Sequence, residues 1–187
     1  MTLKEMKVKV LGMIEELNPD SELLTDDPDI SAKINEVTNQ VMFELARMKK
    51  IPKYVEMEVS DGDVVDFAKL EKACGYEVYQ INMVGGIDYV FKANGTIVKV
   101  LESGTAEVDV FVYPERITAT TKDKAYEFEL SSDALEIMPY GVAADLLKSD
   151  VSAEYGKVYA ERYETMLQRL DSRYAMTSVF IEGGVNV

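Results

Sequence analysis

Apolar residues recur every three or four positions through the first 50 residues, and this spacing predicts two amphipathic helices. The first helix is predicted from Leu3, Met6, Val10, Ile14 and Leu17. After a polar break, Asp27 and Pro28 supply an N-cap and a proline at the first helical position. The second helix, which ends at two lysines, is predicted from Ile30, Ile34, Val37, Val41, Leu45 and Met48.

From Tyr54 the apolar spacing changes to two, which predicts strands between residues 54 and 130. Asn94-Gly95 between apolar runs predicts a tight hairpin, and "VVDFAKLEKAC" predicts a short helical turn. We expect about six strands in a small antiparallel sheet or barrel. The segments concerned are "YVEMEV", "YEVYQINMV", "DYVFKA", "TIVKV", "AEVDVFVYP" and "AYEFEL".

The helical spacing returns at Asp133, which we expect to cap a helix, with Glu136 completing a capping box. Pro139 should kink this helix or restart it one turn later. Beyond the break "KSDVS", apolar residues from Val151 to Tyr174 predict one long last helix, which is rich in tyrosine. The tail after Ala175 contains two glycines and has no helical spacing.

Neither pair of helices can bury its apolar stripe alone, so we expect the two pairs to pack together. The predicted fold class is α+β. Residues 1–52 and 131–176 would form a four-helix bundle of two N-terminal and two C-terminal helices, residues 53–130 an inserted β domain, and residues 177–187 an extended tail.

The charge and residue counts narrow the possible functions. A net charge of −14 argues against nucleic-acid binding, because duplex DNA is held mainly by lysine and arginine at its phosphates. An acidic wall is nevertheless suited to a channel along which DNA slides without being held. The chain has no histidine, which excludes Ser-His-Asp catalysis and every zinc site that contains histidine.

Composition and pattern also bear on where the protein works. The single cysteine cannot form an internal disulfide and is typical of a chain made in a reducing cytosol. The N-terminal segment alternates charged with apolar residues and does not resemble a signal peptide. No stretch reaches the run of about 20 apolar residues that a membrane helix needs.

Paired carboxylates are the nearest approach to a catalytic site. Glu56 with Glu58, and Glu127 with Glu129, would lie roughly 7 Å apart on their strands, close to the spacing of inverting glycosidases. The polar face of a half-buried strand explains them better, because each acid alternates with an apolar residue. Neither "DDPD" nor "SDGD" has the ligand pattern of an EF-hand, so we expect no metal, no cofactor and no catalytic residue.

Two C-terminal features suggest contacts with other chains. Tyr155, Tyr159 and Tyr163 lie close to one line of the last helix, where they either fill the core or form a subunit interface. The apolar tail either docks on the chain's own core or, as we favour, adds a strand to a partner. The tail residues concerned are Val179, Phe180, Ile181, Val185 and Val187.

Three segments carry a resemblance to a known family. "ELSSDALEIMPYGVAADLLKSD" is similar to a segment with a strand, an acidic cap and "ALEILPYYVA"-like residues. "YAERYETMLQRL" matches a final helix with an aromatic-Glu pattern, and "VDFAKLEKA" is similar to a "DDF-x-x-L" turn before strands. On these segments the chain resembles the head–tail connector, or adaptor, proteins of tailed bacteriophages. Gly141 stands where that family commonly has an aromatic residue.

The resemblance implies a structural protein of the virion neck, made in the host cytoplasm, without enzymatic activity. Such proteins form a homo-oligomeric ring, typically of twelve copies, that docks on the portal protein, extends the DNA channel and supports tail or neck proteins. The C-terminal tail would bind the portal. Glu154, Glu161 and Glu164 would line an acidic lumen through which DNA passes without specific binding.

Two other functions are compatible with the pattern. One is a module that binds a small ligand or a glycan on its β-sheet, and a carboxylate-dependent glycosidase is the third possibility. Size in solution separates the connector from the binding module, because the connector forms a ring or assembles on the portal. The binding module would be a monomer that a ligand stabilises against heat.

Overall fold

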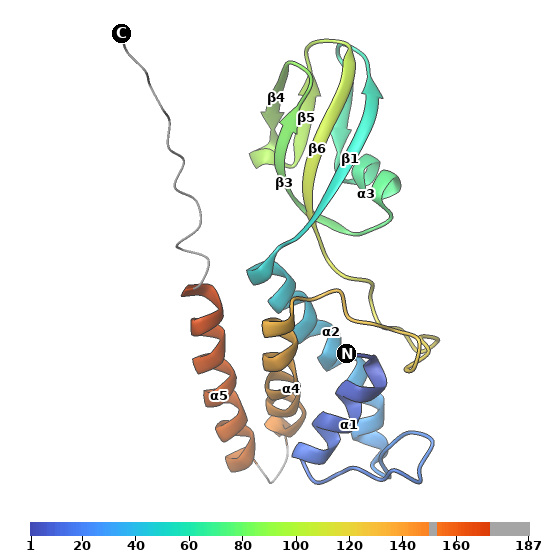
Figure 1. The fold of residues 1–187 in the computed structure, drawn as a ribbon, viewed down its shortest axis with the longest axis vertical. Helices are drawn as coiled ribbons and strands as arrows, with labels where there is room; N and C mark the ends of the chain where they lie inside the picture. Colours follow the sequence, from blue (N-terminus) through green and yellow to red (C-terminus); the bar gives the residue numbers. More distant parts are fainter. Residues whose placement is uncertain (150–152, 173–187) are drawn as a thin grey trace.

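The computed structural model of the protein describes residues 1–149 and 153–172 (Figure 1). Within these ranges it is an α+β fold with five α-helices, two antiparallel sheets and two short 3-10 turns, Ala93–Gly95 and Leu147–Ser149. The helices are α1 (Leu3–Met13), α2 (Pro28–Lys49), α3 (Phe67–Cys74), α4 (Ser132–Leu146) and α5 (Ala153–Ser172). The strands are β1 (Ile51–Val59), β2 (Val64–Asp66), β3 (Val78–Gly85), β4 (Tyr89–Lys92), β5 (Ile97–Val100) and β6 (Gly104–Val112).

Two three-stranded sheets lie at one end of the molecule in Figure 1, above helices α1, α2, α4 and α5. Their strand orders are β1-β6-β3 and β2-β5-β4. β6 is the central strand of the first sheet and pairs with β1 from Ile51 opposite Val112 to Val59 opposite Gly104. Alternate residues of both sheets enclose one apolar core together with Leu70 of α3, as period-two alternation requires.

The predicted four-helix bundle with a single inserted sheet is wrong. α4 lies at the centre of the helical layer and packs against α1, α2 and α5. A segment without regular structure shares their core, because Ile117, Tyr126 and Phe128 are buried in the same apolar cluster. α1 is also too short for a bundle helix: it ends at Met13, and Glu15 has a positive φ of 63°, which a helix does not tolerate.

The predicted strand "AYEFEL" belongs to neither sheet. Pro114 follows β6 and cannot extend its ladder, and the chain leaves the sheet towards the helices. There the segment lies beside the N-terminus: Leu3 N donates to Tyr126 O over 3.0 Å, and Phe128 N donates to Met1 O over 3.3 Å. The alternation of this segment therefore reflects burial of Tyr126 and Phe128 in the helical core.

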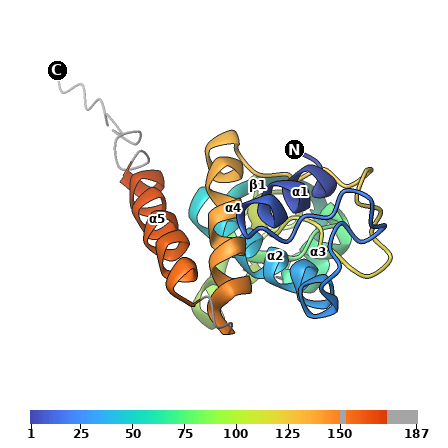
Figure 2. The ribbon, with the colours of Figure 1, turned by 90° about the horizontal axis from the view of Figure 1, so that it is seen from below.

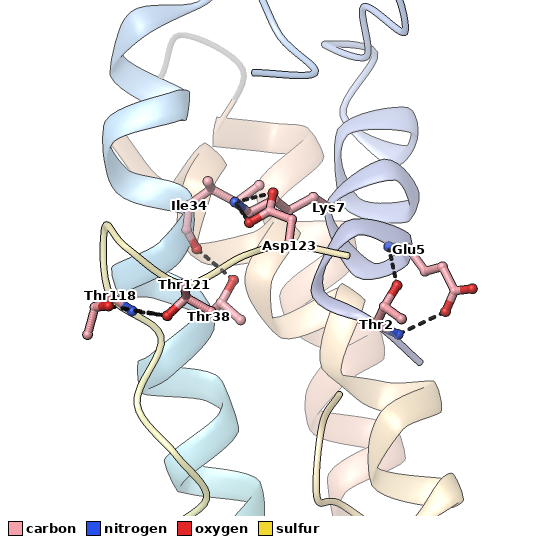
Figure 3. A network of polar contacts seen from close by, with 8 residues as sticks. All are labelled: Thr2, Glu5, Lys7, Ile34, Thr38, Thr118, Thr121 and Asp123. Atoms are coloured by element: carbon pink, nitrogen blue, oxygen red, sulfur yellow. Dashed lines mark hydrogen bonds and ion pairs between the residues drawn. The ribbon is translucent and has the colours of Figure 1, made fainter. Parts of the chain in front are cut away.

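Polar contacts hold the irregular segment against the helices (Figure 3). Lys7 Nζ lies 2.9 Å from Asp123 Oδ2, and Lys7 is nearly buried. The amide of Asn39 donates to Ile117 O and accepts from Ile117 N, both over 2.8 Å. The two hydrogen bonds of Asn39 satisfy the backbone N–H and C=O of Ile117, which have no partner in a helix or strand.

The first turns of α1 and α4 differ in how they are capped. Thr2 and Glu5 form a full capping box at α1, drawn in Figure 3. The capping box predicted from Asp133 and Glu136 is wrong, because the N-cap of α4 is Ser131, and Asp133 lies inside the first turn. Asp133 instead forms an ion pair with Lys49 at the C-terminal end of α2, 2.8 Å apart.

Other local predictions are confirmed. Asn94 and Gly95, both at positive φ, connect the antiparallel strands β4 and β5. Asp27 caps α2 by accepting from the backbone N–H of Asp29 and Ile30. The restart predicted at Pro139 is wrong, because α4 runs without interruption from Ser132 to Leu146. Of the predicted last helix, Val151 and Tyr174 lie outside the described residues.

Candidate functional site

α5 lies at the margin of the helical layer and packs mainly along α4 (Figures 1 and 2). Tyr163 and Leu170 point inward and are buried. The phenol of Tyr163 donates to Glu44 Oε2 on α2 over 2.7 Å. Burial, followed by this hydrogen bond, raises the pKa of Tyr163 far above its ordinary value. The Tyr163 hydroxyl therefore stays protonated, and its hydrogen bond joins α5 to α2 across the face of α4.

The three candidate interface tyrosines have different surroundings. Tyr163 is in the core, and the hydroxyl of Tyr159 donates to Met13 O at the end of α1, so both hold α5 to its own chain. Tyr155 is 71% exposed and lies beside Val158, which is 62% exposed. Of the three, Tyr155 is the one placed to contact another molecule, in company with Val158.

The candidate lumen acids lie on the exposed part of α5. Glu154 and Glu161 are seven residues apart, so they share a line on the helix surface, turned away from Tyr163. Glu164 borders a shallow cleft of about 390 Å³ between α4 and α5, which Lys148 and Lys157 also line. Between residues 153 and 164 the exposed charges of α5 are three carboxylates, Glu154, Glu161 and Glu164, and two cations, Lys157 and Arg162.

The candidate portal-binding residues lie outside the described residues, which end at residue 172. They are Val179, Phe180, Ile181, Val185 and Val187. Binding of this tail to a partner stays a prediction.

The predicted carboxylate pairs fall in different places. Glu56 and Glu58 lie on the solvent side of β1, where Glu56 stands directly opposite Glu107 of β6 and Glu58 accepts from Thr105 Oγ1 over 2.7 Å. Glu129 lies outside the sheets, where it accepts from Tyr76 Oη over 2.8 Å and lies 3.6 Å from Lys53 Nζ. The four acids therefore do not form one site.

A cluster of rings and cations, which sequence reasoning missed, lies where α2 meets the first sheet. The Tyr113 ring lies 4.8 Å from both Phe43 and Tyr79, and Tyr79 stacks on Phe111 at 6.4 Å. Burial raises the pKa of Tyr79 to about 12. Three cations cover these rings at 4.8–5.3 Å from the ring centroids: Arg47, Lys50 and Arg116.

The available sequence signal for this cluster is the spacing of two between Phe111, on β6, and Tyr113, directly after β6. This spacing does not indicate that Arg47, in the last turn of α2, and Lys50, the C-cap residue, supply the cations, because that contact depends on tertiary packing. Gln40, Phe43, Arg47, Tyr113 and Arg116 also border an open cleft of about 540 Å³.

The described part of the chain contains no cluster of three or more potential metal-ligating side chains. Among its helices, none combines the length and apolar character that crossing a bilayer requires. Comparison with known protein families and with curated proteins finds no match to this chain.

Proposed function

We propose that this protein is a head–tail connector of a tailed bacteriophage. It is a non-enzymatic subunit of a ring that docks on the portal protein, extends the DNA channel and supports tail attachment. The support comes from the three segments that resemble this family, of which "ALEIMPYGVAADL" lies within α4 and "YAERYETMLQRL" within α5.

The observation that carries the proposal is the arrangement of α5. Tyr159 and Tyr163 hold this helix to its own chain, while Glu154 and Glu161 are exposed along the opposite side. A helix anchored on one side, with Glu154 and Glu161 exposed on the other among the cations Lys157, Arg162 and Arg169, can form part of the wall of a DNA channel. Carboxylates repel phosphates, so DNA passes a wall of this kind without being retained.

The departure from the family at position 141 has a structural explanation. A Cβ on Gly141 would lie 2.8 Å from Tyr163 Cε2 and 2.9 Å from Val41 Cγ1. Both distances are too short for real atoms, so the Tyr163 ring occupies the volume that an aromatic residue at 141 would need. An aromatic group still fills this part of the core, and α5 rather than α4 supplies it.

Electron microscopy of the full-length protein, alone and mixed with the portal protein encoded by the same genome, tests the proposal. We expect rings with a central channel, or decoration of the portal. A protein that stays free of the portal and forms no ring would overturn it. A monomer whose melting temperature rises with a small ligand or glycan would instead support the binding module.

A further inference from the structure

The solvent side of the sheet β1-β6-β3, here called the outer sheet face, is rich in residues typical of interfaces. Tyr54 is 56% exposed and Met83 is 58% exposed, and the register places both opposite Asp109 of β6, one on each side. Phe111 continues this face towards α2 and is only partly buried. Tyrosine, methionine and phenylalanine are enriched at protein interfaces relative to the remaining surface.

One end of the outer sheet face is acidic. Glu56 and Glu107 are directly opposite each other in the antiparallel register, and Asp109 lies two residues further along β6. Like charges directly opposite on neighbouring strands are destabilising. Among the residues that the structure describes, no lysine or arginine lies within ion-pair distance of Glu56 or Glu107. A cation from another molecule would relieve this repulsion.

The other end of the same face carries two cations, Lys50 and Arg47, and Glu44 and Glu77 border the cleft beside Arg47. Lys50 Nζ lies 4.8 Å from the centroid of Phe111, and Arg47 lies over Tyr113 at 5.3 Å. Within the described ranges, neither cation forms an ion pair with a carboxylate. Lys50 is exposed. The rings beneath the two cations restrict where they lie, so the positive charge has a defined place on the surface.

The acidic and cationic ends are separated by a defined distance. Glu107 and Phe111 are four residues apart on β6, which corresponds to about 13 Å along the strand. A surface with opposite charges at its two ends is complementary to a second copy of itself turned by 180°. In such a pair the acidic end of each copy meets the cationic end of the other, and Tyr54 and Met83 lie between them.

We propose that the outer sheet face binds the same face of a second copy of this chain in a two-fold pair. Lys50 and Arg47 of each copy then approach Glu56 and Glu107 of the other. A two-fold contact uses one patch on both subunits and closes at two copies. The inference therefore does not depend on the proposed ring, whose subunits need contacts that continue from copy to copy.

Sedimentation velocity of the full-length protein at low and high salt tests the pair. We expect a concentration-dependent dimer that weakens as salt rises, because exposed charges are screened. Lys50→Glu and Glu107→Lys should each weaken dimerisation by about tenfold or more. An equimolar mixture of the two variants should recover it, since every contact again joins opposite charges.

Lys33→Glu and Glu22→Lys are the matched controls, because they make the same charge changes at exposed positions away from the sheets. Circular dichroism confirms that each variant is folded, and Glu56→Lys replaces Glu107→Lys if that chain does not fold. The inference is overturned by a wild-type protein that stays monomeric up to about 100 μM. Charge-reversed variants that dimerise as well as the controls also overturn it. Assembly on the portal tests the proposed function separately.

Discussion

The ring of Tyr163 on α5 fills the space that the missing side chain of Gly141 leaves on α4. A methyl group at 141 would lie 2.8 Å from Tyr163 Cε2. Contact this close is available only to glycine at that position, so one residue on α4 sets how near α5 can approach. Since α5 carries the proposed channel acids, this contact links the packing of the core to the position of the functional surface.

Gly141→Ala should therefore lower the free energy of unfolding by about 1–3 kcal/mol, because the added methyl group displaces Tyr163 or Val41. Gly12→Ala is the control: Gly12 lies in α1, and a Cβ there would meet no atom within 4 Å. Alanine at position 12 should stabilise by about 0.5–1 kcal/mol. Chemical denaturation of both variants measures the difference, and equal stabilities would contradict the close packing.

Shortening a buried side chain of the helical core should lower the stability of the protein, whether the residue lies on α2 or on α5. Leu45 on α2 is fully buried and Leu170 on α5 is 3% exposed, and both belong to one apolar cluster. Leu45→Ala and Leu170→Ala should each cost about 2–5 kcal/mol. Leu23→Ala, at a residue 65% exposed, should cost far less. If Leu170→Ala proved as mild as Leu23→Ala, α5 would not be part of this core in solution.

The ion pair of Asp133 with Lys49 makes a pH-dependent contribution to stability. Hydrogen bonding to Lys49 is the main cause that lowers the pKa of Asp133 to about 2, below its ordinary value of 3.8. A lowered folded-state pKa stabilises the fold above the unfolded pKa, and the contribution is lost as pH falls towards 2.

Asp133→Asn should accordingly cost about 1.5–3 kcal/mol at pH 7, and the difference from wild type should shrink between about pH 4 and pH 2. Urea denaturation across this range measures it. Asp20→Asn is the control, because Asp20 is exposed. A constant difference at every pH would show that the charge of Asp133 is not responsible.

Local sequence signals predicted the parts of this fold that depend on local chemistry. Asp27 before Pro28 specified the start of α2, and Asn94-Gly95 specified the β4–β5 hairpin. The alternation of "AYEFEL" predicts a strand that the structure does not contain, because alternation indicates which residues are buried and not what buries them. Its partner is the N-terminus of the chain, a contact that no spacing within the segment could indicate.

In the candidate site, too, some features follow from local sequence and others depend on tertiary contacts. The exposure of Glu154 and Glu161 could be expected from their spacing relative to the apolar stripe of the last helix. The pairing of Glu56 with Glu107 could not, because strand order and register decide which carboxylates meet. The opposite charges of the outer sheet face likewise arise only when the end of α2 comes to lie beside β6.

Removal of residues 177–187 should leave the stability of the isolated chain nearly unchanged and abolish attachment to the portal. The reason is that burial against a partner is the expected driving force for the five apolar side chains of the tail. Thermal unfolding and co-sedimentation with the portal protein measure the two effects. A large fall in melting temperature would show that the tail packs on its own subunit.

The acidity of α5 should matter for DNA passage and not for folding. Glu154, Glu161 and Glu164 are exposed, and exposed charges contribute only about 0–1 kcal/mol each. Changing all three to lysine should therefore leave the stability of the chain and the assembly of particles nearly unchanged. Genome ejection should slow or stall, because lysines in the channel would hold the phosphates that carboxylates repel.

The measurement is particle yield together with the rate of DNA release for the same mutant phage. A matched triple change of Glu16, Glu22 and Glu102 to lysine alters the net charge equally at exposed positions outside α5. If only the α5 variant slows ejection, and the delay lessens as salt screens the added lysines, then the carboxylates act along the DNA path. Normal ejection from particles with lysine-substituted α5 would place this helix away from the channel, because phosphates passing within a Debye length of about 10 Å could not avoid the added charge.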